Sequence, residues 1–343
     1  MRILAVTTMR NEAPFILEWI AYHQRIGVTD FLIYTNDCED GTDDLLDRLT
    51  ALGVVRHERN HSGGKKSVQW RALNKAGRHP LLAAADWIYV TDVDEYLCIH
   101  TGDGRIEDLI TACPNANGFA LPWRMFGCND VAGFVDRPIL EQFTRAAPDR
   151  LLWPWRAVQF KSLYRNVNHY DRLGVHRPKG GGFDGWVDGN GHGMPEVGGT
   201  VVPTLVPRYG LAQINHYAVG SIESFLIKVA RGRPNHTGDP IDLAYWMDRN
   251  FNAIEDRRIL RHQGAVRDNV AALRADPEIV RLHDNGVAWR KARIAELMTQ
   301  SDSFYLMARL LQSGPTRVLP LSLQKHLFDQ LMTVRRLIAE AKS

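Results

Sequence analysis

Residues 85–95 read Ala-Asp-Trp-Ile-Tyr-Val-Thr-Asp-Val-Asp-Glu, an apolar run that is followed at once by acidic residues. Residues 87–91 have the character of a short buried strand. Because side chains alternate along a strand, Asp92 and Asp94 are expected to point to the same side. Two carboxylates so placed can hold a hard divalent cation, which usually keeps open positions for phosphate oxygens. The segment therefore predicts a metal site, and a solvated acidic turn is the alternative.

The residues before this segment alternate between strand and helix signals. Strand signals fall at 3–7, 31–35 and 54–55, and apolar residues recur at helical spacing in 12–26, 42–52 and 66–76. This order predicts a largely parallel sheet with right-handed crossovers. Ligands of open α/β sheets bind beyond the carboxyl ends of the strands. Polar clusters at residues 8–12, 36–37 and 92–95 fall at such ends, so we expect them to converge.

Composition limits the class of protein. The chain has 343 residues, of which 45% are hydrophobic and 24% charged, and its net charge is +3. These values predict one large domain, or one domain with an appendage, and they give no indication of nucleic-acid binding. The four cysteines show no CxxC spacing, which indicates free thiols. No apolar run reaches the length of a signal peptide or a membrane span, so we expect a cytoplasmic protein with no transmembrane segment, and a peripheral association with a membrane stays open.

The second half of the chain changes character along its length. Strand signals are expected at 119–123, 158–164 and 212–217, and a glycine-rich segment at 174–199 separates the last two. Helical patterns follow at 222–232, 241–261, 288–298, 304–311 and 321–341. We therefore predict a sheet domain at residues 1–220 and a helical C-terminal extension at residues 221–343.

Several motifs in the first 232 residues resemble the glycosyltransferase family 2 and family 92 group. They stand in the family's order, at residues 9–12, 17–23, 27–28, 33–36, 85–95, 123–127, 141–144, 161–165, 174–176 and 215–217. The resemblance implies a GT-A fold, a Rossmann-like mixed sheet flanked by helices. It also implies a nucleoside-diphosphate sugar donor, a divalent metal (Mn²⁺ or Mg²⁺), and inversion at the anomeric carbon. The acceptor would be a saccharide or a lipid-linked molecule, as in polysaccharide biosynthesis.

Two other classes stay open at this stage. One is a degenerate GT-A domain that only binds a nucleotide-sugar or a glycan. The other is a metal-dependent nucleotidyltransferase, which also uses a parallel sheet and acidic metal ligands. Nucleotidyltransferases usually carry a glycine-rich phosphate loop after the first strand, and residues 7–12 contain no glycine. Intact Asp92 and Asp94 argue against the degenerate domain.

The candidate binding residues come from the strand ends and from the resemblance. For the nucleotide-sugar they are Thr8, Arg10, Glu12, Asn36, Asp37, Gln69, Arg71, Asp92, His176 and Lys228. Lys65 and Lys66 suit a diphosphate or a solvated helix face equally well. The metal ligands would be Asp92, Asp94 and His216, because a histidine on a late strand completes the shell in many GT-A enzymes. The alternative for His216 and His176 is a packed histidine in the core.

An inverting transferase needs a general base to deprotonate the attacking hydroxyl. The sequence offers Asp130, Glu141 and Asp184, and it does not choose among them. Glu141 could instead pair with an arginine such as Arg145 or Arg165. Asp184 lies close to Trp186, an arrangement that suits a sugar ring.

Overall fold

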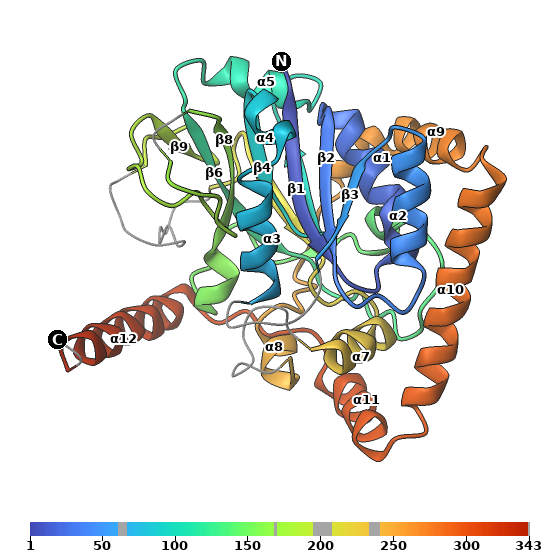
Figure 1. Ribbon diagram of the computed structural model, residues 1–343. Coiled ribbons are helices and arrows are strands. Elements are labelled where there is room, and N and C mark those ends of the chain that lie inside the picture. Colours follow the sequence, from blue (N-terminus) through green and yellow to red (C-terminus); the bar gives the residue numbers. More distant parts are fainter. Residues whose placement is uncertain (61–66, 168–169, 195–207, 233–240, 342–343) are drawn as a thin grey trace.

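The computed structural model describes residues 1–60, 67–167, 170–194, 208–232 and 241–341. Its centre is a sheet with the strand order β3-β2-β1-β4-β8-β6-β10-β5, in which β9 pairs with β6 (Figure 1). Lys65 and Lys66 lie outside the described residues, as do residues 195–199 of the glycine-rich segment.

One half of the sheet is parallel, as the alternating pattern predicts. It contains β1 (Ile3–Met9), β2 (Asp30–Thr35), β3 (Arg56–Arg59) and β4 (Trp87–Val90). The connections between these strands are helical: α1 (Ile16–Ile26) after the short turn η1 (Ala13–Phe15), α2 (Thr42–Ala51), α3 (Val68–Ala76) and α4 (Pro80–Ala84). Strand residues pack on both faces, because Ile3 and Ala5 join the cluster around α1 whereas Leu4 and Val6 join the cluster around α3.

The third strand begins later than the sequence predicts. Residues 54–55 carry the strand signal, but β3 begins at Arg56. The amide of Val54 donates to the carbonyl of Leu49, so Val54 closes the end of α2 instead of pairing with β2. Short apolar pairs after a glycine serve helix ends as well as strands, which explains the shift.

The other half of the sheet is mixed. β8 (Phe160–Arg165) runs antiparallel to both β4 and β6 (Gly118–Met125). β10 (Ala212–His216) lies parallel to β6 and antiparallel to β5 (Glu95–Ile99), and β9 (Trp186–Asp188) lies parallel to β6. Smaller elements are α5 (Ile106–Ala112), α6 (Ile139–Gln142), η2 (Trp155–Val158) and the strand pair β7 (Arg145–Ala146) and β11 (Ile254–Glu255). The prediction of a Rossmann-like, GT-A mixed sheet flanked by helices is confirmed.

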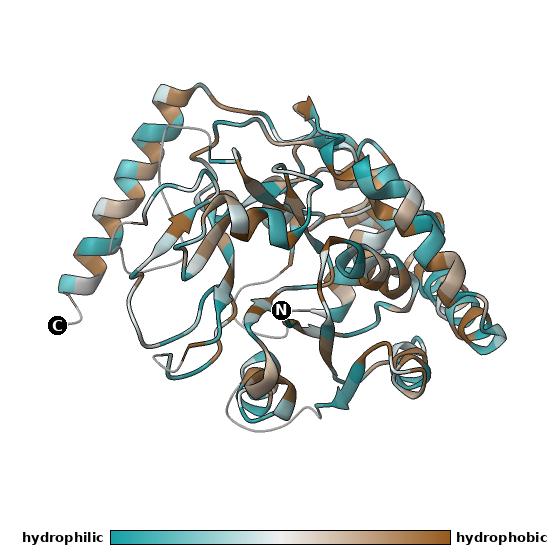
Figure 2. Cartoon of the chain, turned by 90° about the horizontal axis from the view of Figure 1, so that it is seen from above, coloured by the Kyte–Doolittle hydropathy of each residue, from teal (hydrophilic) through white to brown (hydrophobic). Residues whose placement is uncertain are grey.

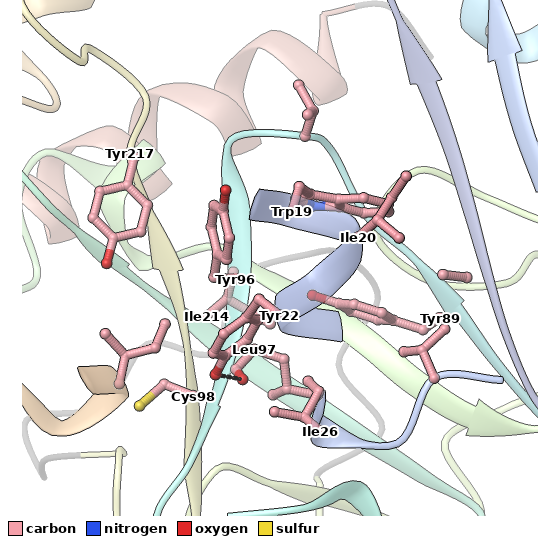
Figure 3. Close-up of a cluster of buried hydrophobic side chains, with 14 of the residues drawn as sticks. Trp19, Ile20, Tyr22, Ile26, Tyr89, Tyr96, Leu97, Cys98, Ile214 and Tyr217 are labelled. Carbon is pink, nitrogen blue, oxygen red and sulfur yellow. Dashed lines mark hydrogen bonds between the residues drawn. The ribbon is translucent and has the colours of Figure 1, made fainter. Parts of the chain in front are cut away.

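A buried aromatic cluster fixes α1 to the strand that follows the acidic motif. Figure 3 shows Trp19 and Tyr22 of α1 close to Tyr96 and Leu97 of β5. The Tyr22 hydroxyl donates to the Leu97 carbonyl at 2.7 Å, and the Trp19 indole donates to the Glu95 carbonyl at 3.2 Å. Because these side chains are fully buried, they hold the start of β5, and with it the acidic turn, in one position.

The chain after β10 is mainly helical and wraps the sheet domain. Its elements are α7 (Ile222–Arg231), α8 (Leu243–Met247), η3 (Arg258–His262), α9 (Gln263–Leu273), α10 (Pro277–Leu297), α11 (Ser301–Ser313) and α12 (Leu321–Glu340). α9 packs on α1, and α10 packs on α2, η1 and α7. The prediction of one helix over 241–261 is wrong. Asp256 in the middle of that range is 5% exposed and binds Arg124 of β6 at 3.0 Å, which requires an extended segment at this point.

The last helix projects from the body and carries both hydrophilic and hydrophobic residues along its length (Figure 2). Its first turn is fixed by Gln324, whose side-chain oxygen accepts from the amides of Leu152 and Trp153. Within the described ranges no helix combines the length and the apolar character that a bilayer crossing needs. The division of the chain at residue 220 stays a prediction.

Candidate functional site

The loops after β1 and β2 are tied together at the carboxyl edge of the sheet. Asn11 and Asp37 both have a left-handed backbone, with φ of 57° and 48°. The Asn11 side chain accepts from the Glu39 amide at 2.8 Å, and the Arg10 guanidinium donates to the Asp37 carbonyl at 3.1 Å. Asparagine and aspartate tolerate this backbone region better than most residues. The predicted convergence of these two clusters is therefore seen in the structure.

Asp92 joins the same edge from β4 and is held by two donors. The Gln69 amide of α3 donates to one carboxylate oxygen at 3.1 Å. The Lys161 ammonium of β8 donates to the other at 2.8 Å. Asp92 and Gln69, two of the predicted nucleotide-sugar residues, thus lie together, and Lys161 is added to them.

Lys161 forms a second ion pair below the acidic turn. Its ammonium lies 3.3 Å from the Glu95 carboxylate, and both side chains are completely buried. Glu95 also accepts from the Asp92 amide at 3.0 Å and from the Thr91 hydroxyl at 3.1 Å. Burial raises the pKa of Glu95 to about 8, although Lys161 acts in the opposite direction. The closer Asp92 is therefore the main counter-ion of Lys161.

Asp94 points to a different set of side chains. The Lys228 ammonium of α7 donates to one oxygen of Asp94 at 2.7 Å, and Nε2 of His216 in β10 lies 3.7 Å from the other oxygen. Burial opposes ionisation of Asp94, but Lys228 and His216 together hold its pKa well below the usual value. Burial also lowers the pKa of His216, although Asp94 acts in the opposite direction.

Glu12 is paired with a second cation of α7. The Arg231 guanidinium binds both the Glu12 carboxylate and the Arg10 carbonyl. Lys228 and Arg231 lie three residues apart and therefore on one face of the helix. α7 thus presents two half-buried cations to the acidic edge of the sheet.

A narrow pocket opens beside Asp94. Its volume is about 60 Å³, and its walls combine apolar side chains, among them Phe15, Phe134 and Phe143, with charged ones. The charged residues in its lining are Glu12, Asp94, Lys228, Arg231 and Arg290. None of Asn36, Asp37, Gln69 or Asp92 lines it. Two other predicted nucleotide-sugar residues, Glu12 and Lys228, do line it, so the pocket adjoins the predicted donor site on the Asp94 side of the acidic motif.

His176 is packed close to Lys161. Among the described residues, one of its ring nitrogens has a hydrogen-bond partner. Its Nδ1 lies 2.8 Å from the Phe160 carbonyl, and its ring lies 5.2 Å from that of Trp123. Burial, followed by the charge of Lys161, lowers the pKa of His176 to about 4. These contacts are those of a packed histidine, and a contact with the donor stays a prediction.

The remaining nucleotide candidates lie at the expected strand ends. Thr8 and Asn36 are partly exposed near the ends of β1 and β2, and Asp37 is exposed. Arg71 is partly exposed on α3, two residues after Gln69. Their roles in nucleotide binding stay predictions.

The three general-base candidates lie in different places. Asp130 follows the carboxyl end of β6 and is exposed, and its carboxylate makes no hydrogen bond or ion pair with any residue that the structure describes. Glu141 on α6 is bound by Arg267 at 2.9 Å, and not by Arg145 or Arg165. The carbonyl of Asp184 accepts from Asn117, next to the first residue of β6, so Asp184 lies at the opposite edge of the sheet.

A three-ligand metal site is not preformed. Nowhere in the described ranges do three His, Cys, Asp or Glu side chains lie close enough together to hold an ion. Both oxygens of Asp92 already have donors. Asp94 and His216 face each other, and Nδ1 of the buried His216 has no hydrogen-bond partner. These two residues fit part of a divalent-ion shell, and the full set of Asp92, Asp94 and His216 stays a prediction.

Two charged residues at this edge were not predicted from the sequence as part of the site. Lys161 lies within a family-like motif but carries no local sign of pairing with Asp92, from which it is 69 residues distant. Arg290 lies outside the motifs altogether. Only the packing of β8 and α10 brings them to the acidic edge.

Comparison with known proteins identifies a family. The model of glycosyltransferase family 92 matches residues 3–178. A family 92 protein of Oryza sativa subsp. japonica is 32% identical over 110 residues, and one of Arabidopsis thaliana is 33% identical over 98 residues. These stretches cover 30% and 27% of this chain but 17% and 16% of the relatives, so the chain spans less than a fifth of their length.

Solved structures show weaker likenesses. S. aureus TarS 1-349, alone and in complex with UDP-GlcNAc, is 13% and 15% identical and gives a TM-score of 0.29 in both cases. The alignments cover 48% of this chain and 47% and 46% of TarS. A TM-score this low carries no argument. The family model, in contrast, matches more than half of the residues, and on that match the chain belongs to glycosyltransferase family 92.

Proposed function

We propose that the protein transfers a sugar from a nucleoside-diphosphate sugar to a saccharide or lipid-linked acceptor, with inversion at the anomeric carbon. The observation that carries this proposal is the convergence of Asp92 and Asp94 with the half-buried cations of α7 at the carboxyl edge of the sheet. Membership of family 92 supports it. Fold alone does not decide the reaction, so the argument rests on these side chains.

The donor nucleotide is assigned to the parallel half of the edge. Thr8, Arg10, Asn36 and Asp37 lie at the ends of β1 and β2, where α/β sheets bind nucleotides. Gln69 connects this area to Asp92. A donor bound in this orientation would extend its diphosphate from Asn36 towards Asp94.

The leaving group needs positive charge as its bond to the sugar breaks. Lys228 and Arg231 supply two cations on one helix face beside Asp94. Their attraction to a diphosphate is strong because both are largely removed from water. A divalent ion held by Asp94 and His216 would add Lewis-acid neutralisation of the same diphosphate.

Inversion by a single displacement requires one base on the acceptor side. Asp130 is the best placed of the three candidates, because its carboxylate is exposed and unpaired at the active edge. Its loop also adjoins the start of α7, since the Ile222 amide donates to the Val131 carbonyl at 3.1 Å. Asp130→Asn should lower the transfer rate by about a hundredfold or more, and Asp184→Asn at the opposite edge is the control. A larger loss in Asp184→Asn would contradict the assignment.

The first test of the function is a calorimetric titration with UDP and with GDP, in Mn²⁺ and then in chelator. Binding of one nucleotide would support the transferase and identify its donor class. Loss of that binding in chelator would support the metal. If a folded protein binds neither nucleotide, the degenerate glycan-binding domain becomes the better account. Pyrophosphate release from a nucleoside triphosphate would instead favour the nucleotidyltransferase.

A further inference from the structure

The pocket beside Asp94 contains an arginine with an unusual environment. Arg290 of α10 lines the pocket, is only 5% exposed, and makes no hydrogen bond or ion pair with any described residue. Its Nε atom is buried without a partner. A buried guanidinium without a counter-ion is costly, since arginine stays charged in proteins. Burial lowers the pKa of Arg290 to about 10, which still leaves it charged at pH 7.

Close packing of α10 fixes this arginine in place. Gly286 lies one helical turn before Arg290, and a Cβ atom at Gly286 would meet the Cβ of Ala13 at 2.5 Å. Only glycine permits this approach of α10 to η1. The Arg290 guanidinium then lies 4.6 Å from the ring centre of Phe15 and 5.1 Å from that of Phe134. The two rings orient the guanidinium, and their negative faces offset part of the free-energy cost of burying its charge.

The charges around the pocket do not balance. Asp94 is paired with Lys228, and Glu12 is paired with Arg231. Arg290 is the third cation in the lining, where three cations face two carboxylates, and the nearby Asp40, which also acts on Arg290, has its two oxygens occupied by the amides of Ala13 and Thr42. A bound anion would complete the set.

The size and position of the pocket indicate which anion. A volume of about 60 Å³, of which one water takes roughly 10–15 Å³, holds a carboxylate or a phosphate group. Asn36, Asp37, Gln69 and Asp92 do not line the pocket, whereas Glu12 and Lys228 of the predicted nucleotide-sugar residues do, so the pocket adjoins the proposed donor site across Asp94. The apolar walls around Phe15, Phe134 and Phe143 suit the less polar face of a sugar that enters beside the anion.

We propose that this pocket is an acceptor subsite in which Arg290 binds the carboxylate or phosphate group of an anionic saccharide acceptor. The inference rests on the proposed function and specifies its acceptor class. In this proposal the acceptor is recognised by α10, which lies outside the residues that the family model matches.

Ligand-observed NMR titration of the full chain tests this subsite without any donor. The probes are glucuronate, glucose 6-phosphate and neutral glucose, each with and without saturating UDP. Wild-type protein should bind an anionic sugar about tenfold more tightly than glucose, as one charge-assisted hydrogen-bonded contact predicts. Inorganic phosphate should displace the anionic sugar, and UDP should not.

Arg290→Met should remove the preference for the anionic sugar and leave UDP binding unchanged. Arg293→Met is the matched control, because Arg293 lies on the same helix and pairs with Glu296 near the surface. If Arg290→Met does not fold, the wild-type titrations still decide. Equal binding of glucuronate, glucose 6-phosphate and glucose would overturn the proposal, as would an unchanged preference in folded Arg290→Met.

Two results separate this inference from the proposed function. If UDP displaces the anionic sugar, the pocket belongs to the donor diphosphate and the acceptor assignment is wrong. If neither UDP nor GDP binds but the anionic preference holds and depends on Arg290, the transferase fails and the anion site remains.

Discussion

The two carboxylates of the acidic motif lie two residues apart but in unlike surroundings. Asp92 is bound by Lys161, a completely buried lysine that also faces Glu95. Asp94 is bound by Lys228, which lines the pocket and is 17% exposed. A buried lysine shared by two carboxylates holds the acidic turn in place, whereas a lysine at a pocket wall can meet a ligand. The comparison indicates that the Asp92 side supports the site and the Asp94 side performs its chemistry.

Removing Lys161 should have the largest effect on stability. Lys161→Met leaves Asp92 and Glu95 without their shared cation, and breaking such a buried pair costs about 3–5 kcal/mol. Urea denaturation monitored by circular dichroism would measure this loss. Lys325→Met is the control, because the Lys325–Asp329 pair is exposed and should contribute under about 1 kcal/mol. A similar small change in both variants would refute the supporting role of Lys161.

Exchanging each aspartate for asparagine should separate the two sides in turnover. Asp94→Asn should lower the rate of sugar transfer by about a hundredfold to a thousandfold, because Asp94 positions Lys228 and would hold a divalent ion against the leaving diphosphate. Asp92→Asn should cost less, because Asp92 faces Lys161 and Gln69 and does not line the pocket. Steady-state kinetics on both folded variants would show the order. A greater loss in Asp92→Asn would reverse the assignment of the two sides.

Acid should lower the free energy of unfolding through His176, which packs close to Lys161. Its pKa is about 4 in the folded protein against an ordinary value of 6.5, so the unfolded chain binds the proton first as the pH falls. The stabilising effect of the neutral His176 imidazole is fully present above pH 6.5 and is lost progressively down to about pH 4. At pH 5 the loss is on the order of 2 kcal/mol. Free energies of unfolding at pH 7 and pH 5 would therefore differ less in His176→Gln than in wild type. Equal differences would contradict the lowered pKa.

Glu141 should show the smallest effect. Its pair with Arg267 is on the surface, where Arg267 is 63% exposed, and the pair lowers the pKa of Glu141 through a hydrogen bond. Glu141→Gln should change the free energy of unfolding by less than about 1 kcal/mol and leave turnover close to wild type. Loss of turnover in a stable Glu141→Gln protein would instead identify Glu141 as the base and remove Asp130 from that role.

Local patterns were enough to predict most of the parallel half of the sheet. The alternation of strands and amphipathic helices gave β1, β2 and β4, and the polar residues at their ends converge as expected. The apolar pair at residues 54–55 is ambiguous, because Val54 closes the end of α2 and does not belong to a strand. The prediction of one helix over 241–261 was wrong for a different reason. Asp256 is held by Arg124, and no periodicity reveals a contact between residues 132 positions apart.

The acidic motif and its place after a buried strand follow from eleven consecutive residues. Which carboxylate faces the pocket does not, because Lys161, His216 and Lys228 reach Asp92 and Asp94 only after β8, β10 and α7 have packed against β4 and β5. Local sequence sets backbone preference and burial over a few residues, and it therefore predicts strands, helix ends and the chemistry of a motif. Partners of a buried charge are chosen by the tertiary fold, since an ion pair in the interior forms only where packing excludes water and brings the two side chains together.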